Sequence, residues 1–382
     1  MQIKKVLYVT DIVGLGGGET SLLNHLDSLN RKEYMPTVLC SKSGMLTDKL
    51  LTIGIEVKII KWRQAKKLAH FFIYYPFISF FKLLKFLYKS CFDIIHVNTF
   101  NSIVVIGPAA KLCNTPVVWT CHGWWPTGKI TGIFINLFVS KTIAVSNFVK
   151  KKLQNPGNVH PSKIIQIPLG IEQARYLNVK PESIDSIKDE YNLPKDIPIV
   201  GMIGRYQKLK GHHVFIKMAS EINKTHPNVC FMVIGSEVFG KASETAYGNQ
   251  IKELIHDRAL EKKVILTGFR DDIANIFGAL DVLVVPSEVE TFGMVVLEAM
   301  ASGPPVISCS KGGPTEIIHD GKNGFLIDGQ DPVKMAKKVC YLIDNKEIGE
   351  KIKISAKQVI TQKYLIKDQV SKIEAVYSDL LN

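Results

Sequence analysis

The chain has 382 residues, of which 46% are hydrophobic and 22% are charged, and its formal net charge is +13. At about 150 residues per domain this length predicts two or more domains, and the composition excludes collagen-like, low-complexity and disulfide-scaffold proteins. The positive charge is concentrated in residues 1–179, where 22 lysines and arginines stand against 8 acidic residues, and it favours a nucleic acid, an anionic membrane or an anionic substrate as partner.

The first residues predict a β-strand and no secretory signal. Their apolar run is only a few residues long and ends at Asp11, without an h-region or a cleavage site. The seven cysteines include no Cys-x-x-Cys pair, which argues against a disulfide framework and against a thiolate zinc site. These features favour a protein of the reducing cytoplasm.

Short β-branched runs alternate with helical stretches along the chain, a pattern typical of parallel sheets with helices on both faces. In the first half, strands are expected at Lys4–Thr10, Pro36–Ser41, Glu56–Trp62, Asp93–Thr99, Pro116–Cys121, Lys141–Ser146 and Lys163–Pro168. Charged clusters and prolines over residues 171–197 predict a linker followed by a short helix. In the second half, strands are expected at Ile199–Ile203, Val229–Gly235, Val264–Thr267, Val282–Pro286, Val306–Ser308 and Gly324–Ile327.

This pattern predicts an α/β fold with two tandem Rossmann-like domains. The N-terminal domain is expected over residues 1–178 and the C-terminal domain over residues 179–363. A terminal helix is expected within residues 364–382, and we expect it to pack back on the N-terminal domain.

The segment Phe71–Phe92 combines aromatic side chains with lysines. Its uncharged part, Phe71–Phe81, is about half the ~20 residues that a membrane-spanning helix needs, and Pro76 interrupts it. Beyond this proline the spacing predicts two opposite helical faces, one with Lys82, Lys85 and Lys89 and the other with Phe80, Leu84 and Leu87. Such a helix either covers the sheet or lies in a membrane interface, and we expect peripheral contact with an anionic membrane.

A glycine-rich turn, Gly14–Thr20, follows the first expected strand. Glycines let the backbone approach a ligand and expose amides at a helix N-terminus, where an anion is favoured. The turn does not match a dinucleotide fingerprint, because Glu19 stands where that pattern has its third glycine or alanine.

A second block, Pro286–Ser308, places two carboxylates around the start of an expected helix. Glu290 lies in the loop before the helix and Glu298 lies inside it among apolar residues. A buried carboxylate needs hydrogen-bond donors, which the two hydroxyls of a sugar diol or a buried lysine or arginine would supply. We expect Thr291–Met294 to open the helix, with free amides that stabilise a phosphate.

Two cations, Arg205 and Lys210, follow the first strand of the second domain. They lie at the carboxyl end of that strand, the edge at which open α/β sheets bind ligands. Two cations aimed into this crevice suit a diphosphate and would stabilise the charge of a leaving diphosphate.

The motifs together resemble the retaining GT-B glycosyltransferases of glycosyltransferase family 4. The resemblance is carried by GRYQKLKG, ETFGMVVLEAMASGPPVI, SKGGPTEII, NGFLI, IPLGI, TCHG and the glycine-rich turn, and it covers nearly the whole chain. It implies a cleft between the two domains, an acceptor bound by the first domain, and a nucleotide-diphosphate sugar bound mainly by the second. On family grounds the nucleotide is expected to be UDP. Such enzymes retain the anomeric configuration and need neither a metal ion nor another cofactor.

The resemblance also assigns roles to individual residues. It implies that Arg205 and Lys210 hold the diphosphate, that Glu298 binds the ribose hydroxyls and that Glu290 binds the hydroxyls of the donor sugar. Main-chain contacts to the donor are implied for Phe292, Gly293 and Met294, and a place near the diphosphate is implied for Gly16 and Gly17. His122 corresponds to the histidine near the transferred sugar. His96, at the end of the fourth expected strand, is a further candidate for facing the acceptor.

The chain is therefore expected to be a cytoplasmic, membrane-associated hexosyltransferase that builds a surface polysaccharide or glycolipid on a lipid-linked or saccharide acceptor. Three alternatives stay open. They are a nucleotide-sugar 2-epimerase of GT-B type, an NAD-dependent oxidoreductase, and a non-catalytic module that binds a nucleotide sugar or a nucleic acid. Under the glycosyltransferase hypothesis, no nucleic-acid partner is expected.

Overall fold

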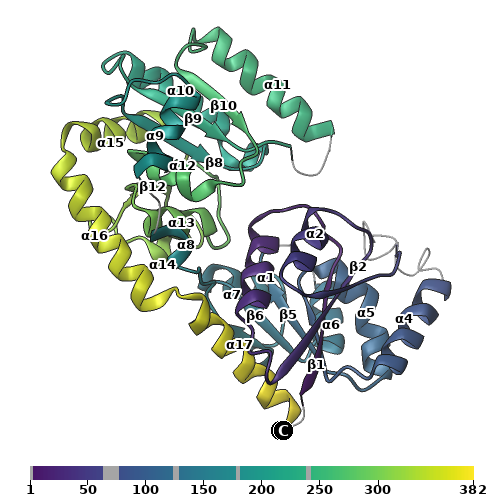
Figure 1. Ribbon diagram of the computed structural model, residues 1–382. Helices are drawn as coiled ribbons and strands as arrows, with labels where there is room; N and C mark the ends of the chain where they lie inside the picture. Colours follow the sequence, from purple (N-terminus) through teal and green to yellow (C-terminus); the bar gives the residue numbers. More distant parts are fainter. Residues whose placement is uncertain (1–2, 63–76, 124–128, 178–180, 238–241) are drawn as a thin grey trace. The chain divides into compact units, whose positions relative to one another are not determined.

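The computed structural model describes residues 3–62, 77–123, 129–177, 181–237 and 242–382 (Figure 1). The chain divides into two compact units, each built on a parallel sheet, and the expected two-domain α/β fold is confirmed. The first unit comprises Met1–Gly170 and Ile366–Asn382, and the second comprises Ile171–Leu365. The chain thus leaves the first unit after Gly170, earlier than the expected boundary at residue 178, and re-enters it at Ile366.

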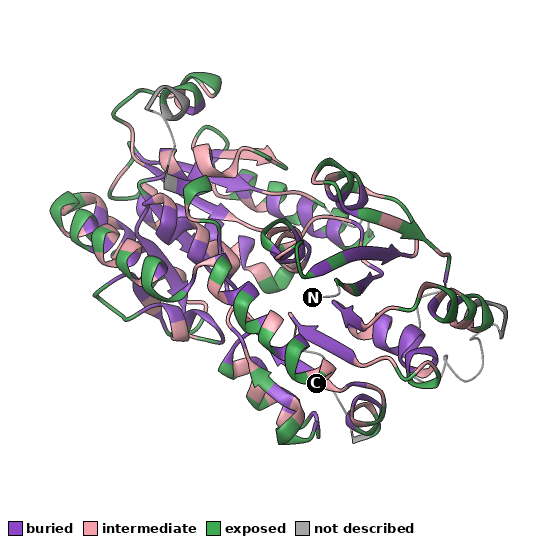
Figure 2. Cartoon of the chain, turned by 60° about the horizontal axis from the view of Figure 1, so that its bottom comes forward, coloured by how far each residue is buried: buried purple, intermediate pink, exposed green. Residues whose placement is uncertain are grey.

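The sheet of the first unit has seven parallel strands in the order β3-β2-β1-β4-β5-β6-β7. Its strands are β1 Lys4–Thr10, β2 Tyr34–Cys40, β3 Glu56–Ile59, β4 Ile94–Val97, β5 Val117–Cys121, β6 Lys141–Ala144 and β7 Ile164–Gln166. The central strands are buried on both faces, which explains why they are continuous apolar runs in the sequence. In Figure 2 most strands are drawn as buried, and the exposed residues lie mainly on helices and loops.

Helices cover both faces of this sheet. They are α1 Gly17–Ser28, α2 Met45–Thr52, α4 Phe77–Ser90, α5 Phe100–Leu112, α6 Lys129–Phe138 and α7 Asn147–Gln154. Parallel strands are joined by right-handed crossovers, so α1 and α2, which lead from β1 to β3, lie on one face. Helices α4, α5 and α6 lead in the opposite direction and pack successively against one another on the other face.

The C-terminal helix α17, Ile366–Leu381, belongs to the first unit and packs against α1. Its Tyr377 is buried and its hydroxyl forms hydrogen bonds with the Tyr8 hydroxyl, at 3.0 Å, and with Nδ1 of His96. Nε2 of His96 in turn forms a hydrogen bond of 2.7 Å with the hydroxyl of Thr120. The structure therefore corrects the idea that His96 faces an acceptor, because its imidazole lies inside the core, where burial holds its pKa well below the usual value.

The sheet of the second unit has six parallel strands in the order β10-β9-β8-β11-β12-β13. Its strands are β8 Ile199–Ile203, β9 Cys230–Ile234, β10 Val264–Gly268, β11 Val282–Val285, β12 Val306–Cys309 and β13 Phe325–Ile327. Its helices are α8 Ala174–Leu177, α9 Pro181–Glu190, α10 His212–Asn223, α11 Ala242–Asp257, α12 Ile273–Ala279, α13 Met294–Ser302, α14 Pro314–Ile317, α15 Pro332–Asp344 and α16 Lys346–Lys363. One core cluster joins the sheet to α10, α11 and α15 through Phe215, Ile251 and Met335.

The lysine-bearing segment is described from Phe77 onward, so the expectation for its first residues, 71–76, lies outside the described part. Within α4 the side chains of Lys82, Lys85 and Lys89 are exposed, while Leu87 is buried. The apolar face therefore covers the first unit, where α4 packs against α5. In the described ranges, no helix combines the length and apolarity that crossing a membrane requires.

Candidate active site

The second sheet has a topological switch point between β8 and β11, its two central strands. The chain continues from β8 toward β9 and β10 on one side, and from β11 toward β12 and β13 on the other. Ligands of open α/β sheets bind at the carboxyl end of such a point, where the loops diverge. The loops after β8 and β11 carry Arg205, Lys210 and Glu290, so these three candidate residues lie on the same edge.

Lys210 and Glu290 form an ion pair at this edge. Nζ of Lys210 lies 2.6 Å from Oε1 of Glu290, and the two side chains are 25% and 12% exposed. The hydroxyl of Ser287 donates a second hydrogen bond of 2.6 Å to the same oxygen. Both contacts use Oε1, which fixes the carboxylate in one orientation.

Glycine lets the two loops approach each other closely. Gly211 has φ of +76°, and a Cβ at this position would lie 2.1 Å from the carbonyl oxygen of Pro286. The side chain of Gln330 donates to that same carbonyl at 2.7 Å, and the amide of Glu288 donates to the carbonyl of Leu209 at 2.8 Å. These contacts hold Lys210 against the segment that carries Glu290.

The loop after β12 supports the same segment from another side. The amide of Gly313 donates to the carbonyl of Glu290 at 2.8 Å, and a Cβ on Gly312 would lie 1.9 Å from that carbonyl oxygen. A Cβ on Gly313 would lie 2.2 Å from the carbonyl oxygen of Phe292. The two glycines of the SKGGP stretch are therefore needed for the close contact of two backbones, a role that the sequence analysis did not assign.

Helix α13 begins at Met294, after Gly293 in a left-handed conformation with φ of +101°. The expectation that Thr291–Met294 open the helix is corrected, since residues 291–293 belong to the loop. The first amides of a helix lack partners within it, so the N-terminus of α13 offers donors to an anion on the edge that Glu290 occupies. Phe292, the residue before the N-cap, is buried and packs against Tyr364.

Glu298 lies in the second turn of α13 and is half-buried. Its Oε1 accepts a hydrogen bond of 3.0 Å from the hydroxyl of Tyr176, on the short helix α8. Burial raises the pKa of Glu298 to about 7, while the Tyr176 hydrogen bond and the charge of Arg175 oppose this rise. Among the described residues, the hydrogen-bond partner of Glu298 is therefore a tyrosine hydroxyl and no buried lysine or arginine.

Arg205 lies directly after β8, in a stretch supported by the loop that follows β9. The amide of Gly204 donates to the carbonyl of Ile234 at 2.9 Å, and a Cβ on Gly235 would lie 2.1 Å from the carbonyl oxygen of Gly204. The amide of Tyr206 donates to the carbonyl of Ser236 at 3.3 Å. The backbone on both sides of Arg205 is thus fixed at the same sheet edge as Lys210.

In the first unit, the candidates gather at the carboxyl edge of the other sheet. Gly16 is the N-cap of α1, Gly17 is its first residue, and a Cβ on Gly18 would touch the ring of His122 at 3.5 Å. Nε2 of His122 forms a hydrogen bond of 3.3 Å with Oδ1 of Asn98, whose amide contacts the carbonyl of Gly18 at 3.4 Å. Burial lowers the pKa of His122 to about 4, so its imidazole is neutral at physiological pH.

Three partners of the candidate residues were missed from the sequence. Ser287 precedes Glu290 by three residues, and the sequence pointed to it only through its place in the Pro286–Ser308 block. Asn98 and Tyr176 contact His122 and Glu298 across 24 and 122 residues of sequence, and no local pattern connects such pairs.

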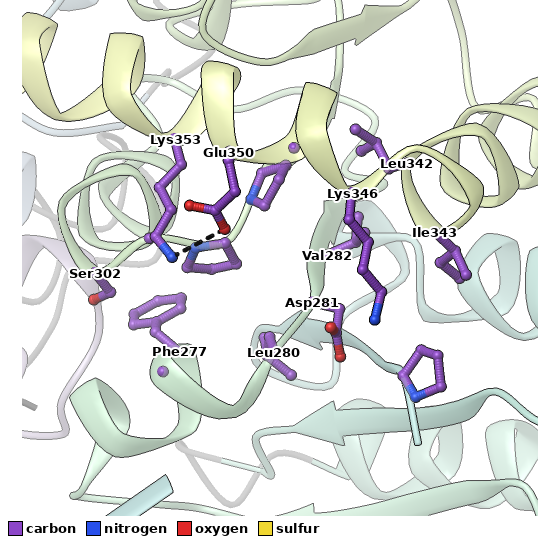
Figure 3. Close-up of a pocket in the computed structure, with 16 residues that line it drawn as sticks. Phe277, Leu280, Asp281, Val282, Ser302, Leu342, Ile343, Lys346, Glu350 and Lys353 are labelled. Atoms are coloured by element: carbon purple, nitrogen blue, oxygen red, sulfur yellow. Dashed lines mark hydrogen bonds and ion pairs between the residues drawn. The ribbon is translucent and has the colours of Figure 1, made fainter. Parts of the chain in front are cut away.

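A pocket of about 240 Å³ lies at the opposite, amino edge of the second sheet (Figure 3). It is lined by residues that precede β8, β11 and β12, together with Lys346, Glu350 and Lys353 of α16. No candidate residue lines this pocket. Among the residues that the structure describes, there is also no cluster of three or more histidines, cysteines or carboxylates with the geometry of a metal site.

The two sheets and their glycine-lined carboxyl edges define a protein of two Rossmann-like units. Two family models match it: Glycosyltransferase Family 4 over residues 15–175 and Glycosyl transferases group 1 over residues 183–359. The chain belongs to the group 1 glycosyltransferases and has the GT-B fold.

Relatives and solved structures agree with this family. The chain is 26% identical over 399 residues to the Escherichia coli enzyme UDP-Gal:alpha-D-GlcNAc-diphosphoundecaprenol alpha-1,3-galactosyltransferase, covering 99% of this chain and 97% of the relative. It is 30% identical over 190 residues to the D-inositol 3-phosphate glycosyltransferase of Acidothermus cellulolyticus, covering 48% of this chain and 41% of the relative. Anabaena Alr3699/HepE, solved in complex with UDP-glucose, matches with a TM-score of 0.87 and 23% identity over 98% of this chain and 99% of its own.

Proposed function

We propose that this glycosyltransferase is a retaining, metal-independent enzyme that transfers a hexose from a UDP-sugar to a lipid-linked saccharide or a growing cell-surface glycan. The observation that carries the proposal is the Lys210–Glu290 pair, fixed at the switch point of the second sheet beside the N-terminus of α13. One cation, one carboxylate and a helix N-terminus suit the three parts of a sugar diphosphate. The epimerase alternative gains no support from the relatives described above.

In this proposal Arg205 and Lys210 bind the diphosphate. Oε1 of Glu290 is occupied by Lys210 and Ser287, so we assign Oε2 to the hydroxyls of the donor sugar. Glu298 accepts from the ribose hydroxyls beside the Tyr176 hydrogen bond. The backbone of Phe292, Gly293 and Met294 contacts sugar and phosphate, and a helix N-terminus favours that anionic group.

The chemical step exchanges one bond at the anomeric carbon for another. The bond between this carbon and the diphosphate oxygen breaks, and a bond to the acceptor oxygen forms on the same face. The acceptor hydroxyl gives its proton to the departing diphosphate, so the products are the glycoside and the nucleoside diphosphate. Arg205 and Lys210 lower the barrier because they stabilise charge that grows on the diphosphate.

The first unit is proposed to bind the acceptor, with His122, Gly16 and Gly17 contributing to the catalytic region. A neutral imidazole at His122 can donate to or accept from a sugar hydroxyl without a charge. The Escherichia coli relative is named for a UDP-Gal donor and a diphosphoundecaprenol-linked acceptor, and Alr3699/HepE was solved with UDP-glucose. These relatives favour a UDP-sugar and a lipid-linked acceptor. Because such an acceptor lies in a membrane, we also propose that the protein works at the inner face of the cell membrane.

The donor assignment is tested by thermal unfolding in the presence of UDP-, GDP-, ADP- and dTDP-sugars. A ligand that binds only the folded protein raises the midpoint according to RT ln(1 + [L]/Kd). We expect a selective shift with UDP-sugars that Lys210→Ala and Arg205→Ala abolish. Lys224→Ala is the matched control, because Lys224 forms an exposed pair of 2.7 Å with Glu221 in the same unit. An unchanged shift in Lys210→Ala would refute the diphosphate assignment.

The stereochemistry and the metal requirement are tested on the product. Once a donor is known, the anomeric configuration of the product read by proton NMR must equal that of the donor, and inversion would refute the retaining mechanism. Turnover in excess EDTA must equal turnover without it.

Glu290→Ala is expected to abolish most turnover, whereas Glu221→Ala leaves it unchanged.

A further inference from the structure

Three neighbouring helices of the first unit carry lysines but no acidic residues. Helices α4, α5 and α6 pack successively on one face of the sheet (Figure 1). Their sequences contain no aspartate or glutamate, and their lysines are Lys82, Lys85, Lys89, Lys111 and Lys129. A face of this kind attracts an anionic surface and repels a second copy of itself.

Helix α6 adds an exposed apolar row to this face. Ile130, Ile133 and Leu137 are 69%, 60% and 52% exposed, and their spacings of three and four residues place them on one side of the helix. We call these three residues the α6 stripe. Three large aliphatic side chains in one row are unusual on a protein surface, where exposed apolar residues are normally scattered singly.

The inner side of α6 is fixed by specific contacts, so the helix cannot rotate to bury the stripe. A Cβ on Gly132 would lie 2.2 Å from the carbonyl oxygen of Gly157, which shows how closely α6 approaches the loop after α7. At the other end, Nζ of Lys163 donates to the carbonyls of Asn136 and Val139 at 2.6 and 2.7 Å. These contacts fix which side of α6 carries the stripe.

The neighbouring helices extend the apolar surface. Phe81 and Tyr88 of α4 are exposed on the same side of that helix as its lysines. Leu112 at the end of α5 is also exposed, and the preceding Lys111 donates from Nζ to the carbonyl of Leu137 at 3.2 Å. The ends of α5 and α6 thus meet, so Lys111 and Leu112 lie beside the end of the α6 stripe.

We propose that the α6 stripe is the part of this protein that inserts into the surface of an anionic lipid bilayer, with the lysines of α4 and α5 on the headgroups around it. Aliphatic and aromatic side chains enter the boundary between headgroups and acyl chains, while lysines bind anionic lipids. A second copy is disfavoured as the occupant because it would bring lysines against lysines without a carboxylate on any of the three helices. The inference deepens the membrane contact of the proposed function, but it does not depend on the donor site.

The test measures binding of the full-length protein to sedimented vesicles. Vesicles of phosphatidylcholine with phosphatidylglycerol are compared with vesicles of phosphatidylcholine alone, at low and high salt. We expect binding to the anionic vesicles, and about tenfold weaker binding for the variant Ile130→Ser, Ile133→Ser, Leu137→Ser at either salt concentration. A second variant carries Lys82→Glu, Lys85→Glu and Lys89→Glu. At low salt its binding should be about a hundredfold weaker, because each lysine contributes about fivefold. At high salt the loss should be much smaller, because salt screens the charges.

The matched control places the same substitutions elsewhere. Leu51, Val333 and Ile354 are exposed apolar residues outside these helices, and changing all three to serine should leave vesicle binding unchanged. Wild-type vesicle binding by the α6 variant would overturn the proposal. A concentration-dependent dimer that the α6 variant abolishes would also overturn it, because the occupant would then be a second copy. The thermal shift with a UDP-sugar should persist in the α6 variant, and vesicle binding should persist in Arg205→Ala, so failure of one proposal is distinguishable from failure of the other.

Discussion

Replacing Glu298 by glutamine should make the protein more stable above neutral pH and weaker in binding its donor. Burial raises the pKa of the Glu298 carboxyl from 4.5 to about 7, so the folded protein favours the protonated form. A group with a raised pKa contributes its full stability below the unfolded pKa and loses that contribution as the pH rises through the folded pKa. At about 1.4 kcal/mol per pH unit, ionised Glu298 costs the wild type about 3 kcal/mol above pH 7.

Glutamine keeps the oxygen that accepts from Tyr176 but has no charge to bury. Urea unfolding of the wild type and Glu298→Gln between pH 4 and pH 8 is the assay. The difference in the free energy of unfolding should be smallest near pH 4, grow between about pH 4.5 and pH 7, and stay constant above. Glu253→Gln, on the exposed face of α11, controls for the general effect of losing a carboxylate. A difference that does not vary with pH would refute the reasoning.

Two further substitutions test contacts that support the site and the fold. Gly312→Ala places a Cβ 1.9 Å from the carbonyl oxygen of Glu290 and so displaces the segment that carries this carboxylate. We expect turnover to fall at least tenfold, which corresponds to a rise of ~1.4 kcal/mol in the activation free energy. Wild-type turnover would contradict this. Gly329→Ala is its control, since Gly329 also has a positive φ, +69°, but no atom within 4 Å of the added Cβ. Tyr377→Phe removes the hydroxyl shared by Tyr8 and His96, and it should cost about 1–3 kcal/mol in urea unfolding. Tyr341→Phe, on an exposed tyrosine, should cost almost nothing, and equal losses in the two variants would contradict the role of the buried network.

All of the expected strands are present, and the central ones could be predicted because parallel strands buried on both faces are continuous apolar runs. Their ends were less predictable. β2 begins at Tyr34, although Pro36 lacks an amide proton, because β3 pairs with β2 only from Thr37 onward and Pro36 has a neighbour on one side alone. β3 ends at Ile59, before the expected Trp62. It is the edge strand of the sheet, where one neighbour limits its length.

The position of Arg205, Lys210 and Glu290 at one edge of the second sheet could also be predicted, because all three lie in loops that follow β8 or β11. Their partners could not. Tyr176 reaches Glu298 across 122 residues, and Tyr377 reaches His96 across 281 residues, so only the tertiary fold brings them together. For the same reason, His96 could be taken from the sequence as an accessible strand-end residue, although the structure encloses it under the C-terminal helix.

The return of helix α17 to the first unit determines when that unit can be completed during synthesis. Its core contains Tyr377, and its loop residue Gly170 donates from its amide to the side chain of Gln369 at 2.6 Å. A ribosome that has made all of β1 to β7 has therefore not yet supplied every part of the core. The second unit, a continuous stretch from Ile171 to Leu365, is translated in full before the last helix of the first unit emerges. A stop codon before the codon for Ile366 would thus damage the domain that contains the first strands of the chain.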